Sequence, residues 1–362
     1  MRVLVWQWGR RGAGPRIAVE LARALGRMSG TAAVLSLSNG AEILAGPDAP
    51  VCGMPVATYE SISGFLARAL LAPITIVSLI GRLRHVRPDV AVCAMPGPLD
   101  LLLVAALGWT RIPFLVIVHD ADSHPGERAP LLMWLQRRLI RRADGLVALS
   151  THVADRLHEQ GLAGADKPVF VFRHPPMSFG TLPPPPFAHG GVPRLLFFGR
   201  LLEYKGLDLL FEALSRLDLL SLEVRVVGSG PESNALAALR ALPFVAVENR
   251  WVPEDEIAGV IAWADVLVLP YREASQSGAA AVAIAAGRWI IATRVGGLVE
   301  QLSDERLAVF CDPEAAGLAA AMRGVCMTRP VPLQPGTDPD AAWWSFATAL
   351  TARIDSEILW RR

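Results

Sequence analysis

The chain has few cysteines and almost no net charge. Its 362 residues include four cysteines, and 35 Lys plus Arg balance 34 Asp plus Glu to a formal charge of +1. A chain with balanced charge has no overall positive electrostatic field to attract a polyanion, so we do not expect nucleic-acid binding. The cysteines lie far apart without the paired spacing of metal ligands, so neither a zinc site nor a disulfide framework is indicated. They are Cys52, Cys93, Cys311 and Cys326.

Long apolar runs are also missing, although hydrophobic residues make up 52% of the chain. Ala69 to Gly81 is too short for a membrane span, and Leu101 to Val118 is broken by Arg111 and Pro113. The first residues lead directly into a strand pattern and lack the apolar core of a secretory signal. We therefore expect the chain to reside in the cytoplasm.

The helical region from Ser61 to Arg84 fits two interpretations. A helix that is apolar on one side and basic nearby is typical of peripheral contact with an anionic bilayer. An ordinary core helix fits the same pattern, so both interpretations stay open. The residues concerned are Phe65, Leu66, Leu70 and Leu71, with Arg68, Arg82 and Arg84 nearby.

Short apolar runs alternate with helical periodicities along the whole chain, which is typical of βαβ units and parallel sheets covered on both faces. The length favours two domains over one. We predict an α/β protein with Rossmann-like domains over residues 1–176 and 194–340, a Pro/Gly-rich linker over 177–193, and a terminal helix over 341–362 that packs back on the first domain. The predicted strands are Arg2–Trp6, Ala32–Leu37, Val90–Ala94, Phe114–His119, Gly145–Leu149 and Val169–Phe172, then Arg194–Gly199, Glu223–Gly228, Val245–Val247, Val266–Leu269, Trp289–Thr293 and Ala308–Phe310. The clearest helices of the first half are Arg16–Leu25, Ser61–Val86 and Leu131–Arg142.

Two cations follow the first strand of the second half. Arg200 and Lys205 stand next to glycines at the carboxyl end of that strand, where open α/β sheets bind ligands. Such a pair neutralises the negative charge that grows on a leaving diphosphate, and it does so without a metal ion. Solvated turn charges are the alternative interpretation.

Two further turns of the second half carry candidate binding groups. Gly228 and Gly230 end a strand and allow the backbone to approach a ligand closely, although a purely structural turn fits equally well. Glu273 precedes a Ser-Gln-Ser-Gly loop and a small-residue helix, so it offers a carboxylate to sugar hydroxyls or faces solvent beside a helix cap. The backbone amides at the start of that helix form an anion or sugar-hydroxyl site. They belong to Ser277, Gly278 and Ala279.

In the first half, Gly12 and Gly14 lie in a loop directly after the first strand. Their spacing does not match the dinucleotide fingerprint, which disfavours an NAD enzyme. His119 ends another strand and reads either as a structural residue or as a ligand contact. Asp120 and Asp122 beside it orient an acceptor or cap the following turn.

The three segments of the second half, in this order and spacing, resemble the family 4 retaining glycosyltransferases (glycosyl transferases group 1) over most of residues 194–302. The resemblance implies the GT-B fold, in which two Rossmann-like domains face each other across a cleft. The Gln-Ser-Gly loop is similar to that of a bacterial subgroup. By position, Arg200 and Lys205 would bind the diphosphate and Glu273 the donor sugar. The resemblance also implies donor contacts for His119, Gly12, Gly14, Gly228, Gly230, Ser277, Gly278 and Ala279.

One position departs from the family pattern. Many members carry a second Glu early in the helix after the loop, where it holds the ribose, and Val282 occupies that place here. This departure keeps open a catalytically silent subunit that binds a partner. A GT-B sugar epimerase or phosphorylase is a further alternative, although the acid pair or cofactor lysine that it needs is not evident.

The resemblance implies a retaining hexosyltransferase that takes a UDP- or GDP-sugar and needs no metal or other cofactor. Its acceptor would be a glycan or a polyprenyl-diphosphate-linked sugar in bacterial exopolysaccharide or glycolipid synthesis. We expect such an enzyme in the cytoplasm, with peripheral contact at the inner face of the cell membrane.

Overall fold

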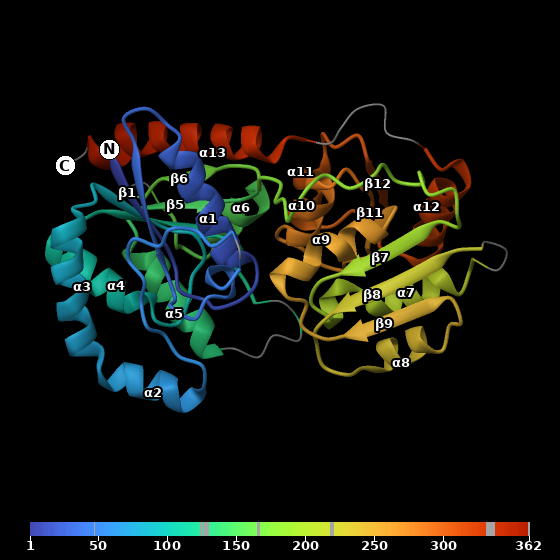
Figure 1. Cartoon of the computed structure of the whole chain (residues 1–362), viewed down its shortest axis with the longest axis horizontal. Helices are drawn as coiled ribbons and strands as arrows, with labels where there is room; N and C mark the ends of the chain where they lie inside the picture. Colours follow the sequence, from blue (N-terminus) through green and yellow to red (C-terminus); the bar gives the residue numbers. More distant parts are fainter. Residues whose placement is uncertain are drawn as a thin grey trace. The chain divides into compact units, whose positions relative to one another are not determined.

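The computed structural model describes residues 1–46, 48–123, 125, 130–164, 167–217, 221–330 and 337–360. The chain divides into two compact units, each built on a six-stranded parallel sheet with helices around it (Figure 1). The first unit comprises Met1–Ser123, Arg128–Phe172 and Asp340–Arg362, and the second is built around Arg173–Pro339. The predicted α/β class with two Rossmann-like sheets is confirmed.

The sheet of the first unit has the strand order β2-β1-β3-β4-β5-β6, with every pair parallel. Successive residues of β1 point to opposite faces of the sheet, and fully buried residues lie on both: Val3 and Val5 on one face, Leu4 and Trp6 on the other. Both faces of the sheet are therefore covered, as the continuous apolar runs of its strands predict. The strands are β1 (Arg2–Gln7), β2 (Ala32–Leu37), β3 (Val90–Cys93), β4 (Phe114–Val118), β5 (Gly145–Ala148) and β6 (Val169–Val171).

Helices α3, α4, α5 and α6 share one hydrophobic core with alternate residues of β1, β3, β4 and β5. This core includes Leu79 of α3, Leu103 of α4 and Leu139 of α5. The helices of the first unit before the terminal helix are α1 (Ala13–Gly26), α2 (Ile62–Leu70), α3 (Ala72–Val86), α4 (Asp100–Thr110), α5 (Pro130–Arg142) and α6 (Thr151–Glu159), with the short 3-10 turn η1 (Glu42–Leu44).

The predicted helix over Ser61–Val86 is wrong in one respect, because the chain breaks it at Leu71. Pro73 lies in the first turn of α3, where it has no backbone N–H to continue the hydrogen-bond ladder of α2. The chain bends by 72° between α2 and α3. Among the described residues, no single helix has both the length and the apolar character to cross a membrane; only this bent pair passes by length and composition.

The sheet of the second unit has the order β12-β11-β10-β7-β8-β9, and its strand pairs are also parallel. Its strands are β7 (Arg194–Phe198), β8 (Glu223–Gly228), β9 (Val245–Asn249), β10 (Val266–Leu269), β11 (Trp289–Thr293) and β12 (Ala308–Cys311). Its helices are α7 (Leu207–Leu214), α8 (Asn234–Arg240), α9 (Glu254–Trp263), α10 (Gly278–Ala285), α11 (Gly296–Leu302) and α12 (Ala315–Thr328), with the 3-10 turn η2 (Glu203–Lys205).

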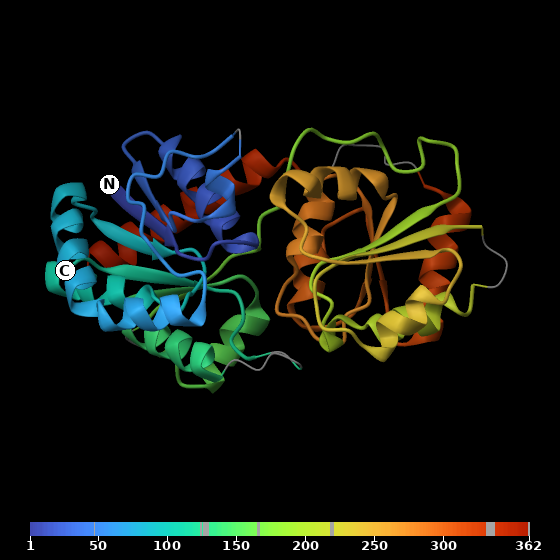
Figure 2. The ribbon, with the colours of Figure 1, turned by 60° about the horizontal axis from the view of Figure 1, so that its bottom comes forward.

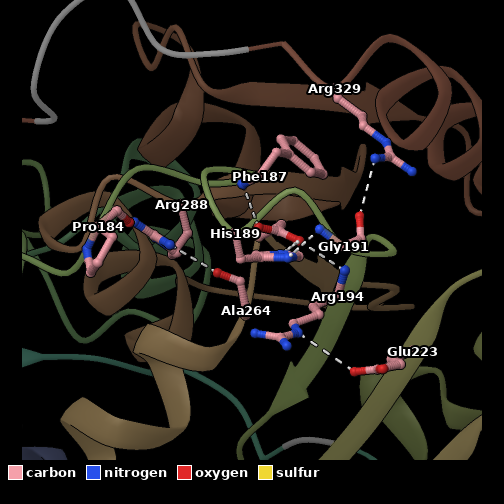
Figure 3. Close-up of polar contacts among 10 residues, drawn as sticks. Pro184, Phe187, His189, Gly191, Arg194, Glu223, Ala264, Arg288 and Arg329 are labelled. Atoms are coloured by element: carbon pink, nitrogen blue, oxygen red, sulfur yellow. Dashed lines mark hydrogen bonds and ion pairs between the residues drawn. The ribbon is translucent and has the colours of Figure 1, made fainter.

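The Pro/Gly-rich segment over 177–193, expected as a linker, is held against the second unit (Figure 3). The buried carboxylate of Asp265 accepts hydrogen bonds from the backbone N–H of Phe187 at 2.5 Å and of Arg194 at 2.9 Å. His189 Nε2 lies 3.0 Å from the same carboxylate. The prolines preclude helix and central strand, but the backbone donors between them remain able to bind one buried acceptor.

A buried arginine holds the other end of this segment. The Arg288 guanidinium donates to the carbonyls of Ala264 and Ala286 at 3.0 Å each, and to that of Pro184 (Figure 3). Burial lowers the pKa of Arg288 to about 10, so the side chain stays charged at neutral pH. Arg288 thus joins the Pro-rich segment, through Pro184, to the residues just before β10 and just after α10.

The chain ends in α13 (Pro339–Arg353) and a six-residue π-helical segment, η3 (Ile354–Leu359). Figures 1 and 2 show this terminal helix running along the sheet of the first unit. The rings of Phe346 and Phe172 lie 5.2 Å apart, and the Ile358 side chain packs against Gly145 of β5. The residues after 340 therefore belong to the first unit, although they follow the second in sequence.

Candidate functional site

The candidate site of the second unit lies where the strand order reverses. Strands β8 and β9 extend the sheet on one side of β7, and β10, β11 and β12 extend it on the other. The loops after β7 and β10 therefore leave the same edge of the sheet in opposite directions. Open α/β sheets bind their ligands in the crevice that forms between two such loops.

Two tyrosines bring the two predicted cations together. Arg200 Nη2 donates to the Tyr204 hydroxyl at 2.6 Å, and Lys205 Nζ lies 4.8 Å from the centre of the Tyr204 ring. Lys205 Nζ also lies 3.7 Å from the centre of the Tyr271 ring. An aromatic face attracts and orients a cation, so the two tyrosines hold these positive charges at the edge of the sheet.

Glycine explains how the two loops come so close. Gly206 follows Lys205 with φ +69°, and a Cβ there would lie 1.8 Å from the carbonyl oxygen of Pro270, just after β10. The backbone N–H of Arg272 donates to the Tyr204 carbonyl at 2.8 Å. Only glycine permits this approach, which places Lys205 over the Tyr271 ring.

A buried polar network continues from Tyr271 to the start of α10. The hydroxyls of Tyr271 and Ser277 lie 3.1 Å apart, and Ser277 Oγ caps the helix by accepting from Ala280 N–H at 3.2 Å. The Gln301 amide accepts from Ser277 N–H at 2.8 Å and donates to its carbonyl at 3.0 Å. Burial raises the pKa of Tyr271 to about 12, so its phenol remains neutral.

These contacts locate the remaining predicted residues of the second unit. Ser277 is buried as the N-cap, and Gly278 and Ala279 begin α10 behind it. Because the Ser277 N–H is taken by Gln301, the exposed amides of the helix start begin after Ser277. Glu273 is exposed on the same loop.

Gly228, the last residue of β8, and Gly230 just after it pack against the loop that follows β7. A Cβ on Gly228 would lie 1.7 Å from the Gly199 carbonyl oxygen, and one on Gly230 would lie 2.3 Å from that of Leu201. Asn249 of β9 binds both the N–H and the carbonyl of Gly230 at 3.1 Å. These close contacts set the path of the loop that carries Arg200.

The remaining predicted residues belong to the first unit and follow two of its strands, β1 and β4. Gly12 has φ +86° as the residue before α1, and a Cβ on Gly14 would lie 2.7 Å from Gln7 Nε2. Gln7, the last residue of β1, also accepts from Gly9 N–H at 2.9 Å. The glycine loop is therefore wrapped around one buried amide side chain.

His119 follows β4 and is buried. Its Nε2 lies 2.9 Å from the carbonyl oxygen of Ala94, which requires that this nitrogen carry the proton. Burial lowers the pKa of His119, so the ring is neutral near pH 7. Strand β3 lies between β1 and β4, so His119 and the Gly12 loop leave the same sheet edge from strands that are not adjacent.

Val282, at the position of the second family Glu, is buried in α10. It lines a cavity of about 30 Å³ together with the segment from Met177 to Pro183. The backbone N–H of Met177 donates to the Ala281 carbonyl at 3.1 Å, which seals this side of the helix. A carboxylate at position 282 would enter an apolar environment, so the valine suits the local packing.

Sequence reasoning missed Tyr204, Tyr271 and Gln301. A signal for the tyrosines exists, because the chain has only three and two of them follow the β7 and β10 motifs. Gln301 has no such signal, since it comes from α11 and reaches Ser277 only in the folded unit. Within the described ranges, no three His, Cys, Asp or Glu side chains gather as a metal site would require.

Known proteins resemble the chain in sequence and in fold. Glycogen synthase of Mycobacterium tuberculosis is 27% identical over 311 residues, covering 78% of this chain and 68% of that protein. Anabaena Alr3699/HepE, solved in complex with UDP and glucose, superposes with a TM-score of 0.69 at 15% identity, covering 98% and 99% of the two chains. UDP-GlcNAc 2-epimerase of Neisseria meningitidis, solved with UDP-GlcNAc, gives 0.60 at 11% identity, covering 97% and 100%.

Two family models match the chain, one in each half. The model described as Glycosyltransferase Family 4 matches residues 14–175, and the model described as Glycosyl transferases group 1 matches residues 192–327. The second range contains the cations, both tyrosines and the Ser277 loop. The chain is therefore a GT-B-fold glycosyltransferase that belongs to family 4, the glycosyl transferases group 1.

Proposed function

We propose that the chain transfers a hexosyl group from a UDP- or GDP-sugar to a glycan or lipid-linked acceptor, with retention of the anomeric configuration. The observation that carries this proposal is the convergence of Arg200 and Lys205 on Tyr204 and Tyr271 at the point where the strand order reverses. The diphosphate of a nucleotide-sugar has the charge that this pair attracts.

In this proposal the cations act most strongly on the departing diphosphate, because its negative charge grows as the glycosidic bond breaks. Tyr204 and Tyr271 hold the cations in place before the donor arrives, so little reorganisation is needed during the reaction. The N–H groups at the start of α10 bind the sugar or a phosphate oxygen, aided by the helix dipole. Glu273 accepts hydrogen bonds from the donor sugar, and no metal ion or other cofactor takes part.

Retention fits a reaction on one face of the sugar, in which the leaving phosphate takes the acceptor proton. His119, neutral and fixed by Ala94, positions the donor sugar, and the Gly12 and Gly14 loop approaches the diphosphate or the acceptor. Bacterial exopolysaccharide or glycolipid synthesis would supply an acceptor of this chemistry. Work in the cytoplasm, where nucleotide-sugars are made, agrees with this role.

Thermal shift with UDP-, GDP- and ADP-sugars tests the donor, because a ligand that binds the folded state raises the melting temperature. Donor turnover is then followed with and without a lipid-linked acceptor, and the anomeric configuration of the product is read by NMR. We expect slow hydrolysis of one donor alone and faster transfer to the acceptor.

The same assay separates the alternatives. The fold-level likeness to an epimerase favours testing conversion of the donor to its epimer, which would contradict sugar transfer. Donor binding without any turnover would instead support a catalytically silent subunit.

A further inference from the structure

The first unit exposes an unusually apolar strip on α2 and the start of α3. None of the nine residues of α2 is buried. Ile62, Leu66 and Leu70 recur at intervals of four residues, so they form one stripe, and Ile62 and Leu70 are 82% and 83% exposed. Ile74 and Val77 of α3 extend the stripe past the bend, with exposures of 69% and 70%.

The other side of these helices is anchored to the unit. Phe65, expected on the apolar face, instead packs its ring 5.1 Å from that of Tyr59 and against the core cluster. Leu79 and Leu83 bury the opposite face of α3. The exposed strip therefore belongs to helices whose other face is packed against the unit. This packing fixes the direction in which the apolar side chains point.

Helix α5 adds a second exposed apolar area. Figures 1 and 2 both place α2 and α5 at the same end of the first unit. Leu131 and Trp134 of α5 are 59% and 50% exposed. The guanidinium of Arg138 stacks 4.7 Å above the Trp134 ring, so a cation and an amphipathic aromatic ring face outward together.

The helices that carry this surface contain charges of one sign. Residues 61–87 and 130–142 contain no Asp or Glu, although the chain as a whole is almost neutral. Their arginines are Arg68, Arg82, Arg84, Arg87, Arg137, Arg138, Arg141 and Arg142. An aliphatic stripe flanked by cations matches a bilayer with negative head groups, because acyl chains accept the stripe and lipid phosphates pair with the arginines.

We propose that α2, the first turns of α3, and α5 form a docking surface for an anionic lipid bilayer, on which the first unit lies without spanning it. A second copy of the chain is a poorer occupant, since it would bring two arginine-rich faces together. The placement of a lipid-linked acceptor beside this surface rests on the proposed function, whereas the docking itself does not.

Vesicle co-sedimentation of the full chain tests the proposal. Vesicles of phosphatidylcholine with phosphatidylglycerol are compared with vesicles of phosphatidylcholine alone, at low and high salt. We expect binding to the anionic vesicles at least about tenfold stronger than to the neutral ones, and weakened by salt. Binding that is absent, or equal on both vesicles, would overturn the proposal.

Two variants and a matched control locate the surface. The triple variant Ile62→Ser, Leu66→Ser, Leu70→Ser and the separate triple variant Arg137→Gln, Arg138→Gln, Arg141→Gln should each reduce binding at least about fivefold. The control Val51→Ser, Met327→Ser replaces exposed apolar residues outside the surface and should bind like the parent chain. Undiminished binding in both surface variants would overturn the assignment, as would a loss of equal size in the control.

Two further measurements keep the outcomes separate. Circular dichroism checks that each variant is folded, and the variant Trp134→Ala on α5 replaces the α2 variant if that one unfolds.

A concentration-dependent dimer that disappears in the α2 variant would assign the surface to a second copy and overturn the lipid proposal. Donor binding measured without vesicles should be the same in the surface variants, so failure of docking and failure of the proposed function are distinguishable.

Discussion

Two sets of cations in the second unit use opposite kinds of partner. Arg288 is buried, and three backbone carbonyls accept its hydrogen bonds. Arg200 and Lys205 lie against the rings and hydroxyl of two tyrosines at the strand-end edge of the sheet. The carbonyls hold the Arg288 donors in the interior, whereas the aromatic faces orient the charges of Arg200 and Lys205 at the edge of the sheet.

The comparison separates a buried structural cation from the two cations that we propose to bind the diphosphate. Arg288 joins three segments and contributes to the free energy of unfolding. Arg200 and Lys205 both lie against Tyr204, and two cations gathered on one ring suit the binding of an anion. The following predictions test this division.

The largest effect is expected for Arg288→Ala. The substitution leaves three carbonyls without their donor, and we expect it to lower the free energy of unfolding by about 4 kcal/mol. Urea denaturation measures this, with Arg323→Ala at an exposed arginine as the control. A loss below about 1 kcal/mol, the size of an ordinary surface change, would contradict a structural role for Arg288.

Arg200→Ala and Lys205→Ala should do the reverse. We expect each to lose about 2–4 kcal/mol of transition-state stabilisation in kcat/KM, as does removal of one preorganised donor, with little change in unfolding. Transfer kinetics and a thermal melt on the same samples separate the two effects. Full activity in both variants would remove them from the mechanism.

A buried carboxylate of the first unit extends the comparison. Asp265 accepts from two backbone N–H groups, whereas Asp100 accepts from Gly97 N–H at 2.7 Å and Cys93 Sγ at 3.5 Å, and its Oδ1 has no hydrogen-bond partner among the described residues. Burial raises the pKa of Asp100 to about 7, opposed by these hydrogen bonds.

This raised pKa predicts a pH dependence of stability. The unfolded chain releases the Asp100 proton near pH 4, but the folded chain keeps it until about pH 7, so the free energy of unfolding falls as the pH rises between these values. We expect a fall of up to about 4 kcal/mol that is absent in Asp100→Asn. Urea midpoints from pH 4 to pH 8 measure it, and identical profiles for both proteins would contradict the assignment.

The smallest effect separates the two contributions of Tyr271. Tyr271→Leu removes the ring under Lys205, and we expect it to weaken binding of a nucleoside diphosphate by about 1 kcal/mol. Tyr271→Phe keeps the ring and loses only the contact with Ser277, so its diphosphate affinity should stay close to that of the parent chain. Equal losses in both variants would show that the hydroxyl, rather than the ring, positions the cation.

The sequence predicts most of the fold, because buried parallel strands are short apolar runs between turn residues. Glu223–Gly228, Val266–Leu269 and Trp289–Thr293 agree with the structure residue for residue. The break at Leu71 was missed, since the apolar periodicity runs through it and Pro73 alone marks the new helix. The attachment of the Pro-rich segment was missed because its partners, the acceptor Asp265 and the donor Arg288, are distant in sequence.

The site was predicted in part. The positions of Arg200 and Lys205 after a strand follow from the motif, because strand ends in a parallel sheet share one edge. Their aromatic supports do not, since Tyr271 approaches Lys205 only through the close contact of Gly206 with Pro270. The glycine pattern at Gly228 and Gly230 fits both a ligand contact and a structural turn, and the structure shows their close packing against the Arg200 loop.

Calorimetric titration of UDP and GDP tests the central claim most directly. The account predicts that the parent chain binds one of them with one-to-one stoichiometry, and that Lys205→Ala or Arg200→Ala weakens this binding at least about tenfold. Binding of equal strength in the parent chain and in both variants, or no binding of either nucleotide to the parent chain, would contradict it.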